Sequence, residues 1–242
     1  MKQTDDRNKA HSDHQAAISE ISIKNINTHA IEIDHSLKVA LSVDCVIFGF
    51  DDHELKVLLI RSDLNEYKNK WTLLGDLVLP DEDLDVAAYR VLYKRTGLKN
   101  VYLEQVHTFG KPGRHPAGRV VTIAYYSLVN IEKCKITTQE HELHWHPVKD
   151  IKQMAFDHKK IFDTCFHRLQ QDTLERHVGF NLLPPKFSLR ELQSVYEAIL
   201  GKELDRRNFR KKILAMEILE DLDELETEVQ HRPGKLYRFK NP

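Results

Sequence analysis

The stretch Gly75–Leu98, GDLVLPDEDLDVAAYRVLYKRTGL, decides how the chain folds. From Asp83 to Thr96 its apolar residues recur at helical spacing, and Gly97 is a helix stop signal. One face of this helix carries Leu84, Ala87, Ala88, Val91 and Leu92. The short strand WTLLGD (Trp71–Asp76) leads into the loop before the helix. The stretch therefore predicts a strand, a loop and an amphipathic helix that packs on a sheet.

The same stretch resembles a Nudix box, which is a glycine pair, five residues, Glu, seven residues, then Arg-Glu-aliphatic-x-Glu-Glu-x-Gly-aliphatic. The positions that match are Glu82, Arg90, Leu92, Gly97 and Leu98. Asp76 replaces the second glycine of the pair. The three acidic positions of the helix are occupied by Val91, Lys94 and Arg95. The outline of the box is therefore kept, and its acidic residues are replaced.

In a Nudix hydrolase these glutamates hold Mg²⁺ or Mn²⁺ and activate water against a phosphoanhydride. Hard divalent cations need oxygen ligands, and Lys94 and Arg95 put two positive charges where a hydrolase has two negative ones. We therefore predict no metal site, no catalytic residue and no cofactor. The alternative is a hydrolase of a nucleoside diphosphate derivative with displaced metal ligands, since Asp81, Asp83 and Asp85 flank the box.

The composition is that of a globular protein with one large domain or two small ones, because 41% of the 242 residues are hydrophobic and 30% are charged. The net charge is −1, so any nucleic-acid surface must be local. Cys45, Cys134 and Cys165 form neither a metal spacing nor a disulfide framework, which favours a cytoplasmic location. No apolar run suggests a membrane span. Residues 1–36 are polar, and we expect a mobile tail.

A hairpin is predicted by the β-branched runs VDCVIFGF (Val43–Phe50) and LKVLLIR (Leu55–Arg61). Further strands are predicted at Trp71–Asp76, Val101–Phe109, Val120–Val129 and Leu143–Val148, and a helix at Asp157–His177. The expected fold is α+β, with an N-terminal Nudix α/β/α sandwich over residues 37–153. A linking helix would follow at 154–180, and a separate domain at 181–242.

The C-terminal domain has the pattern of a helix-turn-helix. Ser188–Glu191 is a capping-box sequence that opens one helix, and Gly201 ends it. A second helix opens at Arg206–Lys212 after a short turn. The segment Lys186–Met216 carries eight basic and four acidic residues, a net charge of +4. This charge could belong to an ordinary solvated face, but its concentration on the second helix favours a recognition helix.

We therefore expect a winged helix-turn-helix that binds double-stranded DNA. Arg206, Arg207, Asn208 and Arg210 would contact base edges or neighbouring phosphates, because arginine pairs with guanine and asparagine with adenine. The expected backbone contacts are Lys186, Ser188, Arg190, Lys211, Lys212, Arg232 and Lys235, the last two at the tip of a β-wing. The acidic stretch 217–228 would project away from the phosphates or pack against a partner subunit.

Three stretches and the altered box together resemble the Nudix-related transcriptional regulator family, from about Val39 to Phe239. They are QVHTFGKPGRHPAGRVVTIAYYSL (Gln105–Leu128), AFDHKKI (Ala155–Ile161) and FSLRELQSVYEAILGKELDRRNFRKKI (Phe187–Ile213). The combination most resembles the sugar-responsive branch with arabinose-type regulators. His115 stands where the family pattern has Asp.

The resemblance implies a homodimeric, effector-gated regulator, in which the Nudix domain senses a small molecule and the winged helix binds an operator. We expect a repressor of a sugar or cofactor catabolic operon whose effector is a sugar, a sugar phosphate or an ADP-ribose-like ligand. The candidate effector-binding residues are Glu82, Arg90, Glu104, Gln105, Arg114 and Arg119. The arginines suit an anion, whereas Glu82, Glu104 and Gln105 suit a neutral pentose. Glu82 and Arg90 could instead form an ion pair that braces the box loop.

Overall fold

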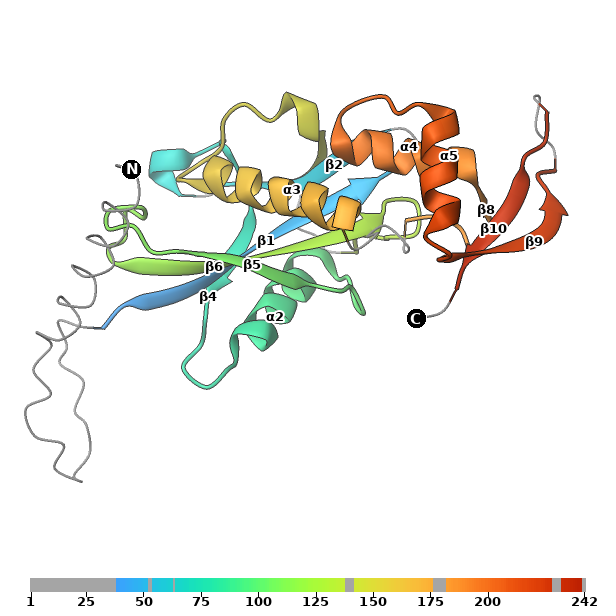
Figure 1. Cartoon of the computed structure of the whole chain (residues 1–242). Coiled ribbons are helices and arrows are strands. Elements are labelled where there is room, and N and C mark those ends of the chain that lie inside the picture. The colour runs from blue at the N-terminus through green and yellow to red at the C-terminus, as the bar shows by residue number, and fades with distance from the viewer. Residues whose placement is uncertain are drawn as a thin grey trace, which may run out of the picture. The chain divides into compact units, whose positions relative to one another are not determined.

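A seven-stranded mixed sheet forms the centre of the N-terminal domain (Figure 1). The computed structural model describes residues 38–51, 54–62, 64–137, 142–175, 182–227 and 232–240. The sheet has the order β3-β2-β1-β6-β5, with β4 paired to β1 and β7 paired to β2. Only the β1–β6 pairing is parallel among these strands. The strands are β1 (Ala40–Phe50), β2 (Leu55–Arg61), β3 (Trp71–Thr72), β4 (Leu74–Leu77), β5 (Glu104–Phe109), β6 (Val120–Asn130) and β7 (Leu143–Pro147).

Two helices cover the two faces of this sheet, α2 (Leu84–Thr96) on one side and α3 (His158–Glu175) on the other. The alternation of side chains along β1 explains the division. Val43, Cys45 and Ile47 pack in the core under α2, and Val46, Phe48 and Phe50 pack in the core under α3. The predicted α/β/α sandwich is therefore confirmed.

Most of the predicted elements are present, with three changes. The hairpin of β1 and β2 is confirmed by its antiparallel register. The stretch Trp71–Asp76 is two strands instead of one, because β3 pairs with β2 and β4 pairs with β1. The strand expected from Val101 begins at Glu104. The helix that we expected to link two domains is α3, and it forms a layer of the sandwich.

The box helix α2 is capped at both ends, and the stop at Gly97 is the one that the sequence predicted. The carboxylate of Asp83 accepts a hydrogen bond from the amide of Leu84, and Gly97 ends the helix with a φ of 74°. A left-handed residue at this position is usually glycine, because glycine has no Cβ. Ala87, Ala88 and Val91 are buried on the side of the helix that faces the sheet. Short 3-10 helices occupy Asn65–Tyr67 (η2) and Val148–Asp150 (η3).

The C-terminal domain is a winged helix-turn-helix. Its elements are β8 (Phe187–Ser188), α4 (Leu189–Leu200), α5 (Arg206–Ala215), β9 (Leu219–Leu225) and β10 (Lys235–Phe239). The capping box at Ser188 and Glu191 is present, and each such cap stabilises a helix by about 1 kcal/mol. The three strands form a sheet of order β8-β10-β9.

The acidic stretch forms one strand of the wing. All of β9 lies within this stretch, and β9 pairs antiparallel with β10. The stretch therefore belongs to the wing, and our expectation that it projects away from the phosphates or packs against a partner subunit stays a prediction. Sequence patterning did not identify the strand because only its first residue, Leu219, is buried, so there is no alternation of apolar residues.

The sandwich and the winged helix share one apolar cluster and several hydrogen bonds. Gln170 of α3 donates to the carbonyl oxygen of Ile199 at 3.0 Å, and Asn130 of β6 donates to that of Leu182 at 2.7 Å. The core under α3 continues into the buried face of α4. Among the described residues, no helix is long and apolar enough to cross a membrane. The expected tail at 1–36 lies outside the described residues.

Candidate functional site

A cleft of about 690 Å³ opens between the start of β1, the end of β2, the box strand β4 and the loop before β6. This volume lies in the usual range of small-molecule sites. Four arginines line the cleft, namely Arg61, Arg95, Arg114 and Arg119, and three acidic residues line it as well, namely Asp44, Asp76 and Glu142. The concentration of guanidinium groups favours an anionic ligand.

The floor of the cleft is a buried network centred on Asp44. Arg114 makes a bidentate ion pair with Asp157, at 2.7 and 2.9 Å, and its Nη2 lies 3.9 Å from Asp44 Oδ2. Thr122 donates to the same carboxylate at 2.7 Å. The Arg114 side chain is only 3% exposed and that of Asp44 only 7%. Arg114 is therefore held by the protein, and it contributes to the cleft mainly by fixing its floor.

The position of Asp44 also explains why the first glycine of the box, Gly75, is kept. A Cβ at Gly75 would collide with the carboxylate of Asp44, so no larger residue fits there without a shift. The second glycine position, Asp76, lies at the edge of the cleft and does not have this restriction. The altered box therefore keeps the glycine on which the floor depends.

His158, the first residue of α3, joins the helix to the same floor. Its Nδ1 accepts from the amide of Leu73 at 3.0 Å and lies 2.6 Å from the hydroxyl of Thr72. The proton of the neutral ring is therefore on Nε2, which lies 3.6 Å from Asp44 Oδ1. Burial lowers the pKa of His158 below its usual value, although the charge of Asp44 opposes the shift.

This lowered pKa predicts a pH dependence of stability. The unfolded chain binds a proton at residue 158 more readily than the folded chain does, so stability is lost as the pH falls below about 6.5. We expect the melting temperature to drop more between pH 7.5 and pH 5.5 in the natural protein than in a His158→Gln variant. Equal drops in a differential scanning fluorimetry series would contradict the assignment.

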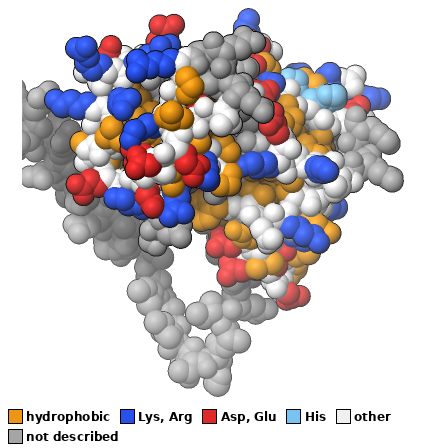
Figure 2. All heavy atoms as spheres, turned by 90° about the vertical axis from the view of Figure 1, so that its right-hand side faces the viewer, with side chains coloured by type: hydrophobic (Ala, Val, Ile, Leu, Met, Phe, Trp, Pro, Cys, Tyr) orange, Lys and Arg blue, Asp and Glu red, His pale blue; other side chains and the backbone are white. Residues whose placement is uncertain are grey.

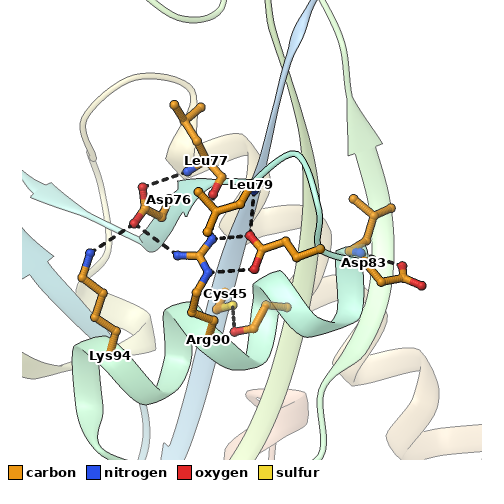
Figure 3. A network of polar contacts seen from close by, with 10 residues as sticks. Cys45, Asp76, Leu77, Leu79, Asp83, Arg90 and Lys94 are labelled. Carbon is orange, nitrogen blue, oxygen red and sulfur yellow. Dashed lines mark hydrogen bonds and ion pairs between the residues drawn. The ribbon is translucent and has the colours of Figure 1, made fainter.

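The box loop is braced by an ion pair between Arg90 and Glu82, and Figure 3 shows the contacts of Arg90. Neither side chain lines the cleft. Arg90 binds Glu82 through two hydrogen bonds of 2.5 and 2.9 Å and also donates to the carbonyl oxygen of Leu77. Arg90 holds the pKa of the Glu82 carboxyl below its usual value. Glu82 and Arg90 therefore have the bracing geometry that we considered as the alternative to effector binding.

Two other candidate effector residues also lie away from the cleft. Glu104 forms a 2.7 Å ion pair with Arg168 of α3, on the face of the sheet that α3 covers. Gln105 points to the opposite face, where its side chain lies 3.4 Å from the hydroxyl of Tyr125. Of the six candidates, only Arg114 and Arg119 line the cleft.

The three acidic positions of the box do not fit a divalent cation. Val91 is buried in the core under α2, the Lys94 Nζ lies 3.5 Å from Asp76, and Arg95 lines the cleft. None of these side chains offers an oxygen ligand. The described residues contain no group of three or more potential metal ligands. We therefore assign no step to a metal.

The basic side chains of helix α5 point in different directions. Phe209 and Ile213 are buried, and Arg207 and Lys211 lie about 160° around the helix from Phe209. Arg206 and Arg210 line a groove toward the wing. By contrast, Asn208 and Lys212 line an apolar pocket beside the end of α3. The outward face of the helix is therefore carried by Arg207, Arg210 and Lys211.

The wing has paired charges where we expected free basic residues. Lys186 lies 2.6 Å from Glu224, and Lys235 lies 2.8 Å from Asp221. Arg238 is paired with Glu220 in the same way. Figure 2 faces this end of the molecule, where acidic side chains are interspersed among the lysines and arginines. Lys186 and Lys235 would have to exchange these carboxylates for phosphates, so the proposed contact surface is smaller than we expected.

Ser188 is also unavailable to DNA through its side chain. It is 2% exposed, and its hydroxyl is occupied in the capping box with Glu191. Arg190 lines the groove toward the wing, and Arg232 is exposed near the start of β10. We therefore remove Ser188 from the proposed contacts and retain Arg190 and Arg232.

Sequence reasoning did not identify several cleft residues. Asp44, Arg61, Phe156, Asp157 and His158 come from three separate segments. One signal was present, because Asp44 interrupts an otherwise apolar strand, and a buried carboxylate requires partners. The partners themselves could not be named without the fold.

A Nudix-type sandwich with a basic cleft, joined to a winged helix with a basic outer face, defines the class of Nudix-related transcriptional regulators. Residues 38–165 match the Nudix domain family, and residues 179–239 match the family described as the NrtR DNA-binding winged helix domain. The chain therefore belongs to the Nudix family, within the NrtR group.

Known relatives agree with this placement. The ADPR responsive transcriptional repressor NtrR of Acinetobacter baylyi is 35% identical over 205 residues, which cover 82% of this chain and 81% of the relative. The structure of Shewanella oneidensis NrtR with a 27mer DNA is similar, with 32% identity and a TM-score of 0.70, covering 83% of this chain and 93% of that one. The Nudix domain of the same Shewanella protein, complexed with ADP ribose, is 28% identical with a TM-score of 0.52, covering 60% and 99%.

These relatives correct one part of the sequence interpretation. We expected the sugar-responsive, arabinose-type branch, whereas the names of the relatives refer to ADP-ribose. The comparisons therefore support the regulator family and do not support the sugar-responsive branch.

Proposed function

We propose that this protein is an ADP-ribose-responsive transcriptional repressor that acts in the cytoplasm and whose Nudix domain binds its effector without hydrolysing it. The observation that carries the proposal is the cleft, which is lined by arginines, together with the cationic side chains at two of the three acidic positions of the box, Lys94 and Arg95. An anionic diphosphate ligand matches this charge. The repressor and Nudix structures named above add support, because they concern DNA and ADP ribose.

The arginines proposed to contact the effector are those of the cleft other than Arg114, which is bound to Asp157. Arg119 is exposed at the rim, where it donates to the carbonyl oxygen of Gly110. Arg61 lies over the ring of Trp71, with its guanidinium carbon 3.8 Å from the ring centroid. Arg95 projects from the last turn of α2. These three side chains would bind the phosphates, while Arg114 stays with Asp157.

Helix α3 would carry the signal from the cleft to the winged helix. Its first residue, His158, is bound to the cleft floor, and Asp157 just before it holds Arg114. Toward its other end, Gln170 is bonded to the end of α4 and Leu169 is buried in the shared core. A ligand that shifts the floor would thereby bias the position of α4 and of the recognition helix. Such a coupling needs a difference in affinity between two arrangements of the domains.

We further propose that the protein acts as a homodimer on a two-fold symmetric operator. A single winged helix contacts a short half-site, and symmetric half-sites call for two copies. The stoichiometry of the complex, measured by sedimentation with a labelled duplex, is expected to be two chains per operator.

ADP-ribose is expected to release the protein from DNA. With a labelled duplex from the upstream region of its own operon, we expect saturating ADP-ribose to weaken binding about tenfold, a typical allosteric coupling. Fluorescence anisotropy measures this directly. Arabinose and ribose 5-phosphate serve as controls and should leave the affinity unchanged. If a pentose releases the DNA and ADP-ribose does not, the proposed effector is wrong.

The same preparation distinguishes a regulator from a hydrolase. After incubation with Mg²⁺ or Mn²⁺, chromatography should recover the ADP-ribose intact, because the box lacks oxygen ligands. Turnover that disappears in a Glu82→Gln variant would establish the hydrolase alternative. Absence of binding to any duplex, at low as well as high salt, would indicate an adaptor with no DNA role.

A further inference from the structure

Two stacked rings, His115 and Phe156, line the cleft, and their centroids are 5.1 Å apart. Tyr67 packs against Phe156 with its ring tilted by 40°, at a centroid distance of 4.2 Å. The planes of Phe156 and His115 are nearly parallel, with an angle of 8° between them. His115 and Phe156 both line the cleft, together with the arginines.

Phe156 is held in an unusual backbone conformation. Phe156 has a φ of 51°, in the left-handed region that bulky residues rarely adopt. Such strain costs free energy and persists where the surrounding structure fixes it, often at ligand sites. Asp157 and His158, the next two residues, are fixed by Arg114 and by the amide of Leu73. These two contacts anchor the chain directly after Phe156, whose ring lines the cleft.

His115 is the ring at the open end of the stack. Its orientation is fixed by a tight turn, in which Nδ1 accepts from the amide of Ala117 and the carbonyl oxygen accepts from that of Gly118. One face of the imidazole is covered by Phe156. Among the described residues, no other ring stacks on the second face. His115 is therefore a planar side chain that is fixed by its turn and lines the cleft beside the arginines.

We propose that His115 receives the purine base of a nucleoside diphosphate effector, which extends the Phe156–His115 stack by one ring. The inference rests on the proposed function and adds where the base binds. Bases stack on aromatic side chains without a need for specific hydrogen bonds. The diphosphate would then lie toward Arg61, Arg95 and Arg119, which line the same cleft.

The test uses the full chain and ADP-ribose whose base is the fluorescent 1,N6-ethenoadenine, because stacking quenches that fluorophore. We expect quenching on binding to the natural protein. His115→Ala should abolish the quenching and weaken binding about tenfold, the usual value of one stacked base. His115→Phe keeps a flat ring and should retain both. His115→Asp, which restores the family residue, should behave like His115→Ala.

Each outcome decides between the proposals. If His115→Phe is as damaged as His115→Ala, the imidazole nitrogens act instead of the ring face, and the stacking inference is wrong. If His115→Ala binds and quenches like the natural protein, the base lies elsewhere, although the proposed function stands. If the natural protein binds no ADP-ribose at all, both proposals fail. Thermal melting of each variant shows whether lost binding reflects lost folding.

Discussion

Replacing Arg207 and Lys211 together with alanine is expected to weaken operator binding about a hundredfold. Both side chains point away from the buried residues Phe209 and Ile213, on the face of α5 that a duplex can reach. A lost base contact costs about 1–3 kcal/mol, and a lost phosphate contact reduces the salt dependence by about one unit of slope. Fluorescence anisotropy with a labelled operator, repeated at several salt concentrations, measures both quantities.

The matched control is Lys212→Ala on the same helix. Lys212 lies only about 60° around the helix from Phe209 and lines the apolar pocket beside α3. Its removal deletes a positive charge as well, so it accounts for the general electrostatic effect. We expect less than about a threefold change in affinity. If Lys212→Ala weakens binding as much as the double variant, α5 does not face DNA as proposed.

The sequence predicted the elements whose signals are local. The capping box at Ser188 and the stop at Gly97 each depend on a few neighbouring residues, and each is present. The β-branched apolar runs Val43–Phe50 and Leu55–Arg61 also predicted the central hairpin. The wing was only partly predicted, because the residues of β9 are mostly exposed and acidic, and a strand paired on a surface needs no apolar pattern.

The candidate site was harder to predict because its contacts join distant parts of the chain. Asp44, Arg114 and Asp157 meet only because β1 and β6 are parallel neighbours and α3 begins above them. Glu104 and Gln105 were candidates by chemistry, but the pleat of β5 turns their side chains to opposite faces of the sheet. The basic residues of α5 had the same difficulty, since composition does not show which of them face outward.

Replacing Arg114 with methionine is expected to destabilise the protein by about 3 kcal/mol. The variant leaves the carboxylates of Asp44 and Asp157 without their shared cation at a site where Arg114 is only 3% exposed. Breaking a buried ion pair on one side costs about 3–5 kcal/mol, and we take the lower value because the Asp157 side chain is a quarter exposed. Urea unfolding followed by tryptophan fluorescence measures the change, since Trp71 and Trp145 lie on the central sheet.

Two further variants separate this charge effect from a general effect of losing an arginine. Arg119→Met removes an exposed guanidinium at the rim of the same cleft and should change stability by less than about 0.5 kcal/mol. Adding Asp157→Asn to Arg114→Met removes one of the two uncompensated carboxylates, so part of the lost stability should return, because neighbouring substitutions are not additive. If Arg114→Met unfolds at the same urea concentration as Arg119→Met, the floor of the cleft is not held by Arg114. The rigid attachment of α3 to the effector site would then need another cause.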